Sequence, residues 1–361
     1  MKLSYIISAL EAYAPLALQE KWDNSGLQTS LPAEAGGECS GALLCLDATE
    51  AVIAEAVARG CNLVVSHHPL IFKGLRSITG RTPAERTVAA AIRAGVAVYS
   101  SHTALDSTRG GISYEMAHIL GAEPVRVLSP AETPMVMLSV TCPRAMAADV
   151  RLILIDSDAP GCDYYDVDNE QAAVTEGAGI PESVISHTPL CRVEATVKAT
   201  SARAIAAALA GMPGGSRLKI DTVPLDNRDN GLGLGLVADF AEAISGAELV
   251  QRLRERFSCG GIKASLGYSP DARIRRIALC GGSGGEFIGA ATASGAQAYI
   301  TADVRYHDFA DNADNPMAIF DIGHFESESC AKGIFYHIIK NKFPNFAVYF
   351  SEAEELPVKY L

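Results

Sequence analysis

The sequence predicts an α/β protein whose mainly parallel sheet is interrupted by a separate α+β insertion. Short, continuously apolar segments alternate with helical patterns in the first third of the chain, and the same alternation resumes near the C-terminus. A segment with different composition and many prolines lies between these two regions. The 361 residues are enough for two domains, or for one core that carries a large insertion.

The first third begins with an amphipathic helix, because apolar residues recur with helical spacing at Leu3, Ile6, Ile7 and Leu10. Apolar runs then predict strands at 42–46, 61–66 and 96–100. Helical patterns are expected beside them at 49–58, 83–94 and 112–120. Apolar strands joined by helices are typical of a parallel sheet covered on both faces.

The C-terminal region continues this pattern. Strands are expected at 274–280, 297–301, 317–321 and 346–350, with a helix at 286–294 and a long helix at 326–342. The intervening segment has an alternating strand at 192–200, an alanine-rich helix at 202–210 and a second helix at 247–257. We therefore expect an α/β core formed by 1–128 and 272–361, and an inserted α+β domain at 129–271.

Composition excludes several classes of protein. With 30 Lys and Arg against 42 Asp and Glu, the net charge of −12 disfavours nucleic-acid binding, because the chain would repel the phosphate backbone. The nine cysteines form no C-x-x-C motif, which argues against a disulfide framework and a thiolate zinc site. No apolar run approaches a membrane span, and the N-terminal segment is better interpreted as a helix than as a signal peptide. A cytoplasmic location is expected.

Histidines and acids follow three of the predicted strands directly, at His67, His68, His102, Asp106, His324 and Glu328. Ligands of open α/β sheets bind beyond the carboxyl ends of strands, so these groups are expected to meet. Neighbouring side chains on an extended chain point to opposite sides, so His67 and His68 are better suited to two ions than to one. His324 and Glu328 would share one side of a helix.

Each cluster alone has a structural interpretation. His67 and His68 can be ordinary strand-end residues, Asp106 can cap a turn, and Glu328 can be a first-turn acid favoured by the helix dipole. Together, three histidines and two carboxylates without a thiolate suit a pair of divalent ions chosen from Zn, Fe, Mn, Co, Ni or Mg. Such a pair requires a bridging carboxylate and is the usual arrangement of two-metal hydrolases.

Two more segments follow predicted strands. The glycine-rich run 280–286 precedes a helix, so its amides could bind an anion, but tight backbone packing is favoured slightly. The run 301–308 adds His307 and several acids, among them Asp303, which could support the ligands or face a substrate as an acid or base. His102 and His307 are candidate catalytic residues, as a general base or as groups that orient a ligand.

Six motifs in order resemble the dinuclear-metal hexamer family that is labelled "GTP cyclohydrolase I type 2 homologue" and is also called NIF-three-like. They are Trp22–Gln28, Ser66–Phe72, His102–Asp106, Cys280–Phe287, Tyr299–Asp308 and Gly323–Glu328. The resemblance covers about 1–125 and 272–361. It implies a toroidal homohexamer in which two similar α/β lobes flank a two-metal site, with an inserted PII-like or ferredoxin-like domain.

By motif match, the resemblance implies the metal ligands His67, His68, Asp106, His324 and Glu328, with Glu328 bridging. It pairs His67 with His324 on one ion and His68 with Asp106 on the other.

The function expected first is metal-dependent hydrolysis of a small nucleotide-like or phosphorylated substrate. The alternative is a non-enzymatic metal chaperone, store or regulatory scaffold. GTP ring opening is a narrower enzymatic alternative and is less favoured, since no residue pattern specifies guanine.

Overall fold

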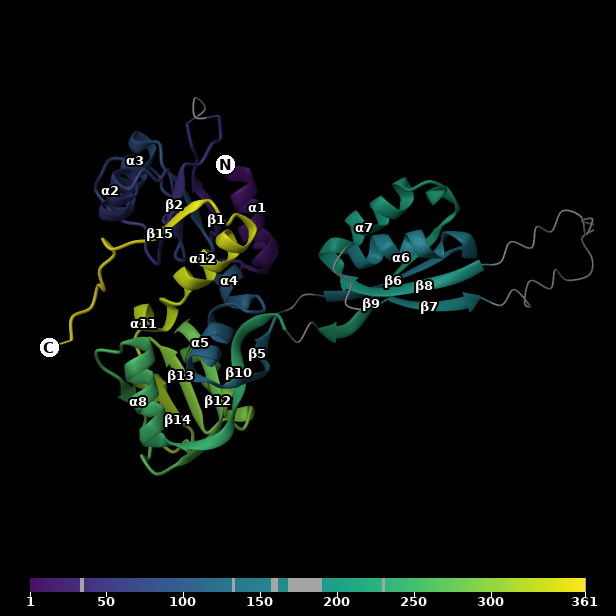
Figure 1. The fold of residues 1–361 in the computed structure, drawn as a ribbon. Coiled ribbons are helices and arrows are strands. Elements are labelled where there is room, and N and C mark those ends of the chain that lie inside the picture. The colour runs from purple at the N-terminus through teal and green to yellow at the C-terminus, as the bar shows by residue number, and fades with distance from the viewer. Residues whose placement is uncertain (33–35, 132–133, 157–161, 168–189, 229–230, 361) are drawn as a thin grey trace, which may run out of the picture. The chain divides into compact units, whose positions relative to one another are not determined.

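The computed structural model describes residues 1–32, 36–131, 134–156, 162–167, 190–228 and 231–360 (Figure 1). The chain divides into two compact units. The first unit combines Met1–Ala131 with Asn230–Leu361, and the second is Glu132–Asp229. No helix in the described part of the chain is both long and apolar enough to cross a membrane.

The first unit contains two sheets. One has the strand order β1 (Gly26–Thr29), β4 (Ala97–Ser100), β3 (Leu63–Ser66), β2 (Gly41–Cys45) and β15 (Ala347–Phe350). Strands β4, β3, β2 and β15 are parallel, and only the edge strand β1 runs antiparallel. The predicted parallel α/β sheet is confirmed, and its last strand comes from the C-terminal end of the chain.

Helices pack against both faces of this sheet, as the continuous apolar runs predict. Leu43 lies in a core cluster with residues of α2 (Glu50–Ala58) and α3 (Pro83–Ala94). The adjacent Leu44 belongs to the opposite cluster, with residues of α1 (Leu3–Tyr13). Successive strand residues point to opposite faces, so both faces are buried.

The second sheet has the order β11 (Lys263–Ala264), β14 (Ala318–Asp321), β13 (Ala298–Ala302), β12 (Arg273–Ser283), β10 (Gly233–Ser245) and β5 (Glu123–Pro130). Its three central strands, β14, β13 and β12, are parallel. The outer strands β11, β10 and β5 pair antiparallel. One large core cluster contains residues of both sheets, among them Leu44, Val65, Leu279 and Phe320.

Short helices connect the strands that lie near the candidate site. They are α4 (Thr103–Ser107), α5 (Ile112–Leu120), α9 (Ile288–Ala293) and α10 (Tyr306–Ala310). The long helix predicted at 326–342 is instead divided into α11 (His324–Glu328) and α12 (Ala331–Lys342). Between them the Ser329 hydroxyl donates to the carbonyls of Phe325 and Glu326, a local bond that competes with regular helix.

The second unit contains β6 (Pro134–Pro143), α6 (Ala147–Asp156), β7 (Cys162–Val167), β8 (Leu190–Lys198), α7 (Ala199–Gly211) and β9 (Lys219–Arg228). Its antiparallel sheet has the order β7-β8-β6-β9. This β-α-β-β-α-β arrangement is ferredoxin-like, as expected for the inserted domain. Val140, Val193 and Leu209 are fully buried in its own core.

The return to the first unit differs from the expected boundary. The contacts place it at Asn230, whereas the sequence analysis expected the core to resume at 272. Strand β10 pairs with β12 and β5, and helix α8 (Gly246–Phe257) contributes Leu249 and Leu253 to the core shared by the two sheets. The sequence patterns do not predict β10, and α8 belongs to the first unit and not to the insertion in which it was expected.

Candidate metal centre

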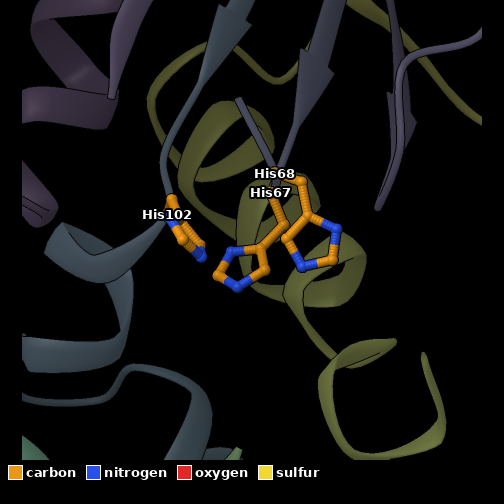
Figure 2. A group of neighbouring side chains, drawn as sticks. All are labelled: His67, His68 and His102. Carbon is orange, nitrogen blue, oxygen red and sulfur yellow. The ribbon is translucent and has the colours of Figure 1, made fainter. Parts of the chain in front are cut away.

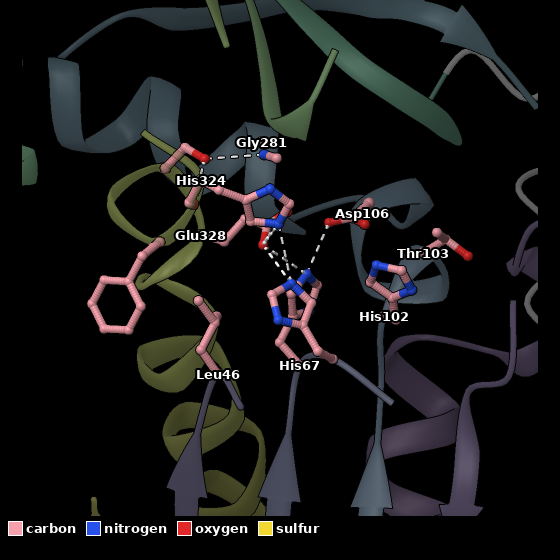
Figure 3. Close-up of polar contacts among 12 residues, drawn as sticks. Leu46, His67, His102, Thr103, Asp106, Gly281, His324 and Glu328 are labelled. Atoms are coloured by element: carbon pink, nitrogen blue, oxygen red, sulfur yellow. Dashed lines mark hydrogen bonds and ion pairs between the residues drawn. The ribbon is translucent and has the colours of Figure 1, made fainter. Parts of the chain in front are cut away.

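The histidines expected at strand ends converge beyond the carboxyl ends of three strands. His67 and His68 follow β3, and His102 follows β4 directly (Figure 2). His324 begins α11 just after β14, and the same short helix carries Glu328 (Figure 3). Parallel strands bring these loops to one edge of each sheet, which is where open α/β sheets bind ligands.

A hydroxyl bridge fixes the ends of β3 and β4. The side chains of Ser66 and Ser100 lie 2.8 Å apart, and the Ser66 hydroxyl also donates to the His68 carbonyl at 2.9 Å. Both serines are fully buried. These bonds hold the turn that carries His67 and His68 beside the strand that precedes His102.

Each of the four histidines has its Nδ1 atom occupied by a protein oxygen. The partners are Ser101 O for His67 at 2.9 Å, Asp47 for His68 at 2.9 Å, Asp23 for His102 at 2.8 Å and Asp303 for His324 at 2.7 Å. A partner of this kind fixes the orientation of the ring and leaves Nε2 as the available ligand atom, as is usual for metal-binding histidines.

Glu328 lies at the middle of the cluster. Its Oε2 atom is 2.9 Å from His68 Nε2, 3.0 Å from His324 Nε2 and 3.7 Å from His67 Nε2 (Figure 3). Only 2% of the residue is exposed. A carboxylate that is removed from water in this way must be compensated by cations, either imidazolium groups or metal ions.

Two buried polar atoms beside Glu328 lack a hydrogen-bond partner within the described residues. They are His67 Nε2 and Asp106 Oδ1, which lie 3.6 Å apart. Buried polar atoms are normally satisfied, so an orphaned imidazole nitrogen facing an orphaned carboxylate oxygen requires an explanation. The donor set fits a divalent cation between them, since imidazole and carboxylate are ligands of Zn and related ions.

The charges of the cluster are strongly interdependent. Burial opposes a charge on His68 and His324, but adjacent carboxylates prevail and raise their pKa values to about 10 and about 9. Burial likewise opposes the negative charge of Glu328, but the surrounding imidazoles hold its pKa well below the usual range. The arrangement therefore favours a charged carboxylate among cationic partners.

Asp106 and Asp23 differ in their electrostatic environment. Burial raises the pKa of Asp106 to about 7. Burial also acts on Asp23, but hydrogen bonds from His102, Thr103 and Ser25 hold its pKa well below the usual range. Asp23 is thus a stable anion that orients His102, whereas Asp106 gains from a nearby positive charge.

Three groups of residues have their ligand atoms within 4.8 Å of one another. The first is His68, His324 and Glu328, the second is His67, Asp106 and Glu328, and the third is His67, His68 and His102. The first two groups share Glu328 and separate the adjacent histidines. They differ from the pairing implied by the resemblance, which joined His67 to His324 and His68 to Asp106. The structure brings all five expected ligands together and adds His102.

His307 does not join these groups. It lies exposed on α10, where its ring contacts that of Tyr306. Asp23, Asp47 and Asp303 are the carboxylates that hold three of the histidines. Asp303 belongs to the run 301–308, whose acids were expected as possible supports of the site, whereas no such role was expected for Asp23 and Asp47. One signal was available, because Asp47 follows an apolar strand almost directly. Asp303 has a left-handed φ of 53°, a strained conformation of the kind that clusters at functional sites.

The glycine-rich run 280–286 packs tightly beside the cluster. A Cβ atom on Gly284 would lie 2.3 Å from Thr301 Oγ1, and one on Gly281 would lie 2.4 Å from Ile112 Cγ2. The backbone N–H of Gly282 donates to Ser327, and its carbonyl accepts from Thr301. These contacts support the packing interpretation of the run over the anion-binding one.

A cavity of about 560 Å³ opens onto the cluster. Its walls include the candidate ligands His68, Asp106, His324 and Glu328 as well as His102. The aromatic side chains of Trp22, Phe72 and Phe287 line the same cavity. A site of this size and composition is suited to a small organic molecule.

The fold and this cluster define an α/β protein with a candidate metal centre between two sheets and a ferredoxin-like insertion. The chain belongs to the Duf34/NIF3 (NGG1p interacting factor 3) family, whose model matches residues 1–357. The family resemblance expected from the sequence motifs is therefore confirmed.

Relatives match along most of the chain. A Halalkalibacterium halodurans protein named "GTP cyclohydrolase 1 type 2 homolog" is 28% identical over 340 residues, covering 91% of this chain and 90% of its own. A Rattus norvegicus protein named "NIF3-like protein 1" is 27% identical over 338 residues, covering 91% of this chain and 84% of its own.

Solved structures share the fold. A Bacillus cereus protein related to NIF3 has a TM-score of 0.82 and 25% identity, with 100% of this chain and 99% of that chain covered. A Staphylococcus aureus protein has a TM-score of 0.78, 20% identity and the same coverage. The α/β fold class predicted from the sequence is confirmed.

Proposed function

We propose that this protein is a metal-dependent hydrolase with two divalent ions per subunit, acting on a small nucleotide-like or phosphorylated substrate. The observation that carries the proposal is the buried Glu328 carboxylate, which is shared by two groups of candidate ligands. His68 and His324 would complete one site, and His67 and Asp106 the other. The ions would be drawn from Zn, Fe, Mn, Co, Ni and Mg.

Bound divalent ions would supply Lewis acidity and would activate water at neutral pH. The protein contributes fixed donors, because its histidines are held through Nδ1 and Glu328 is excluded from water. His102 lies at the edge of the cluster and its ring is oriented by Asp23. With Nδ1 held by Asp23, the ring of His102 lines the cavity and is placed to accept a proton from a reacting group there.

The direct test is turnover by metal-loaded protein. Purified protein would be screened against nucleotides, phosphoesters and cyclic amides, beside the double variant His68→Ala, Glu328→Ala. We expect hydrolysis of at least one class by the parent protein, and a loss of at least about 100-fold in the variant, as for removal of one principal stabilising group. Equal rates from both proteins would reject a metal-dependent hydrolase.

The second candidate function is non-enzymatic metal handling. It is favoured by the position of His324, whose side chain is 36% exposed and therefore accessible to an exchanging ligand. Rapid exchange of bound metal with a chelator, combined with no turnover in the screen, would support a chaperone or store. Slow exchange would argue against delivery of metal to a partner.

We also propose that the protein forms a cytoplasmic, toroidal homohexamer. The support is its membership of the family, for which the sequence resemblance implies this assembly. The native mass from light scattering should be six times that of one chain, and a monomeric mass would contradict the assembly.

A further inference from the structure

Two exposed aromatic side chains lie on the wall of the cavity that contains the candidate metal centre. Trp22 is 59% exposed and Phe72 is 47% exposed. Their ring centroids are 5.9 Å apart, and both rings approach His102, at 5.8 Å and 6.1 Å. Adjoining exposed aromatic side chains on the wall of a cavity are typical of a ligand-binding surface.

Hydrogen bonds hold the two aromatic loops together. The Asn24 side-chain amide donates to the Ile71 carbonyl at 2.7 Å, and the Ile71 N–H donates to Gln28 at 3.1 Å. Gln28 in turn donates to the Asn24 carbonyl at 2.7 Å. The first two bonds connect the loop that carries Trp22 to the loop that carries Phe72, and the third stabilises the first of these loops, so the two rings are positioned before any ligand binds.

Apart from its histidines, the cavity provides aromatic and acidic groups but no cationic side chain among the described residues. None of the described residues that line it is a lysine or an arginine, whereas Asp47, Asp106, Glu286 and Glu328 are acids. The adjacent glycine run uses the Gly282 amide internally. Apart from the histidines and any ions held at the centre, these side chains therefore offer no binding site to an anionic group. A planar ring, in contrast, has an exposed apolar surface to contact.

We propose that Trp22 and Phe72 bind the planar ring of a nucleobase or nucleoside by stacking. Aromatic side chains stack on any base, because every base presents a π-face. A ring held there lies next to His102 and faces the metal cluster. This inference names the substrate class of the proposed hydrolase. The role of the bound ring as a substrate rests on that proposal, whereas the binding of the ring does not.

Trp22 is the single tryptophan of the chain, so intrinsic fluorescence reports directly on this surface. Adenosine, guanosine, cytidine and uridine would each be titrated into metal-loaded protein, with correction for their absorbance. We expect saturable quenching by at least one nucleoside. Ribose 5-phosphate, which has no ring to stack, should leave the emission unchanged.

Variants separate stacking from other binding. Phe72→Leu and Trp22→Leu keep apolar bulk but remove one π-face, and should weaken nucleoside binding about 5- to 150-fold by calorimetry. Tyr5→Ala is the matched control, because Tyr5 is 61% exposed and does not line the cavity. Its Kd should equal that of the parent protein.

The outcomes distinguish this inference from the proposed function. No saturable quenching by any of the four nucleosides, or unchanged affinity in both leucine variants, would overturn the stacking surface even if another substrate is hydrolysed. Tighter binding of ribose 5-phosphate than of nucleosides would do the same and would indicate a phosphate site. Nucleoside binding that weakens in both variants, without turnover, would support the surface while rejecting the hydrolase.

Discussion

The electrostatics of the candidate centre depend most on one side chain, that of Glu328. Its carboxylate is almost completely buried and lies within 3.0 Å of two imidazole nitrogens. An unpaired charge in such a position would cost several kcal/mol, so the native state requires positive charge around it. His67, His68 and His324 surround this carboxylate with rings that are already oriented, which is why the geometry favours cation binding.

Replacing Glu328 with glutamine should remove metal from both groups of ligands at once. The change preserves shape but deletes the charge that the two groups share. We expect the metal content of Glu328→Gln to fall from the proposed two ions per chain to fewer than one, measured by elemental analysis after equilibration with the metal.

Glu85→Gln is the matched control. Glu85 is also a buried glutamate, and it accepts hydrogen bonds from Thr79 and Arg81. Its substitution should lower stability without changing the metal content. Parent-like stoichiometry in Glu328→Gln would show that the carboxylate is not shared between ions.

Residue types and their positions after strands predicted most of the cluster, but not which carboxylate holds which histidine. His67, His68 and His324 were found because they stand directly after apolar strands. Asp23 lies far from His102 in sequence, and Asp303 lies 21 residues before His324. No local pattern relates residues so separated, so the pairs become visible only when the strands are aligned.

At the scale of elements, a segment after β15 is anchored on helix α2. The carboxylate of Glu55 accepts hydrogen bonds from the Ser351 hydroxyl and from the backbone N–H groups of Glu352 and Ala353. Arg59 donates to the same carboxylate from one turn further along α2. The C-terminal segment is thereby fixed at the end of the parallel sheet.

These bonds predict a pH-dependent stabilisation. Burial opposes the charge of Glu55, but the hydrogen bonds prevail and lower its pKa below the usual 4.5. A lowered pKa stabilises the fold above 4.5, and the effect is lost as the pH falls through the lowered value. Glu55→Gln should therefore cost about 1–3 kcal/mol at pH 7 and progressively less below pH 4.5, measured by urea unfolding.

Glu352→Gln serves as the comparison for this experiment. Its side chain is 82% exposed and forms an ion pair with Arg59, so its loss should cost less than about 1 kcal/mol at any pH. A cost for Glu55→Gln that stays constant down to the acid transition would exclude the ionised carboxylate as the source.

Sequence patterns alone do not predict every boundary of the helices and strands. The apolar periodicity of 326–342 continues through Ser329, yet the structure breaks the helix there. The break leaves α11 as a separate short helix that presents His324 and Glu328 on one side. Strand β10 is another element that the sequence patterns do not predict. It lies between β5 and β12 in the sheet, although neither of these strands is next to it along the chain.

At the scale of the whole molecule, the ferredoxin-like unit is inserted between two paired strands. Strands β5 and β10 are antiparallel neighbours, and the Ala131 N–H donates to the Leu232 carbonyl at 2.9 Å. Ala131 and Leu232, which flank the insertion in the described part of the chain, are therefore side by side in the first unit. Each unit also has its own buried core.

Excision of 132–229 with a short glycine-serine linker should consequently leave the first unit folded. Closing a short loop between adjacent strands costs little entropy, and the strand pairing is unchanged. We expect a cooperative thermal transition and the same number of bound metal ions per chain as in the parent. Loss of bound metal in a folded, excised protein would mean that the insertion contributes to the centre.

The sequence by itself determined the α/β class, most helices and parallel strands of the core, and the residues that gather at the candidate centre. These follow from local patterns, because burial on both faces requires continuous apolar runs and the site follows strand ends. Only the tertiary structure decided the grouping of ligands around Glu328 and the pairing of carboxylates with the Nδ1 atoms of the histidines. It also decided the pairing of β10 and the position of Trp22 and Phe72 on the cavity wall. Each of these depends on contacts between segments distant in sequence, which no local pattern encodes.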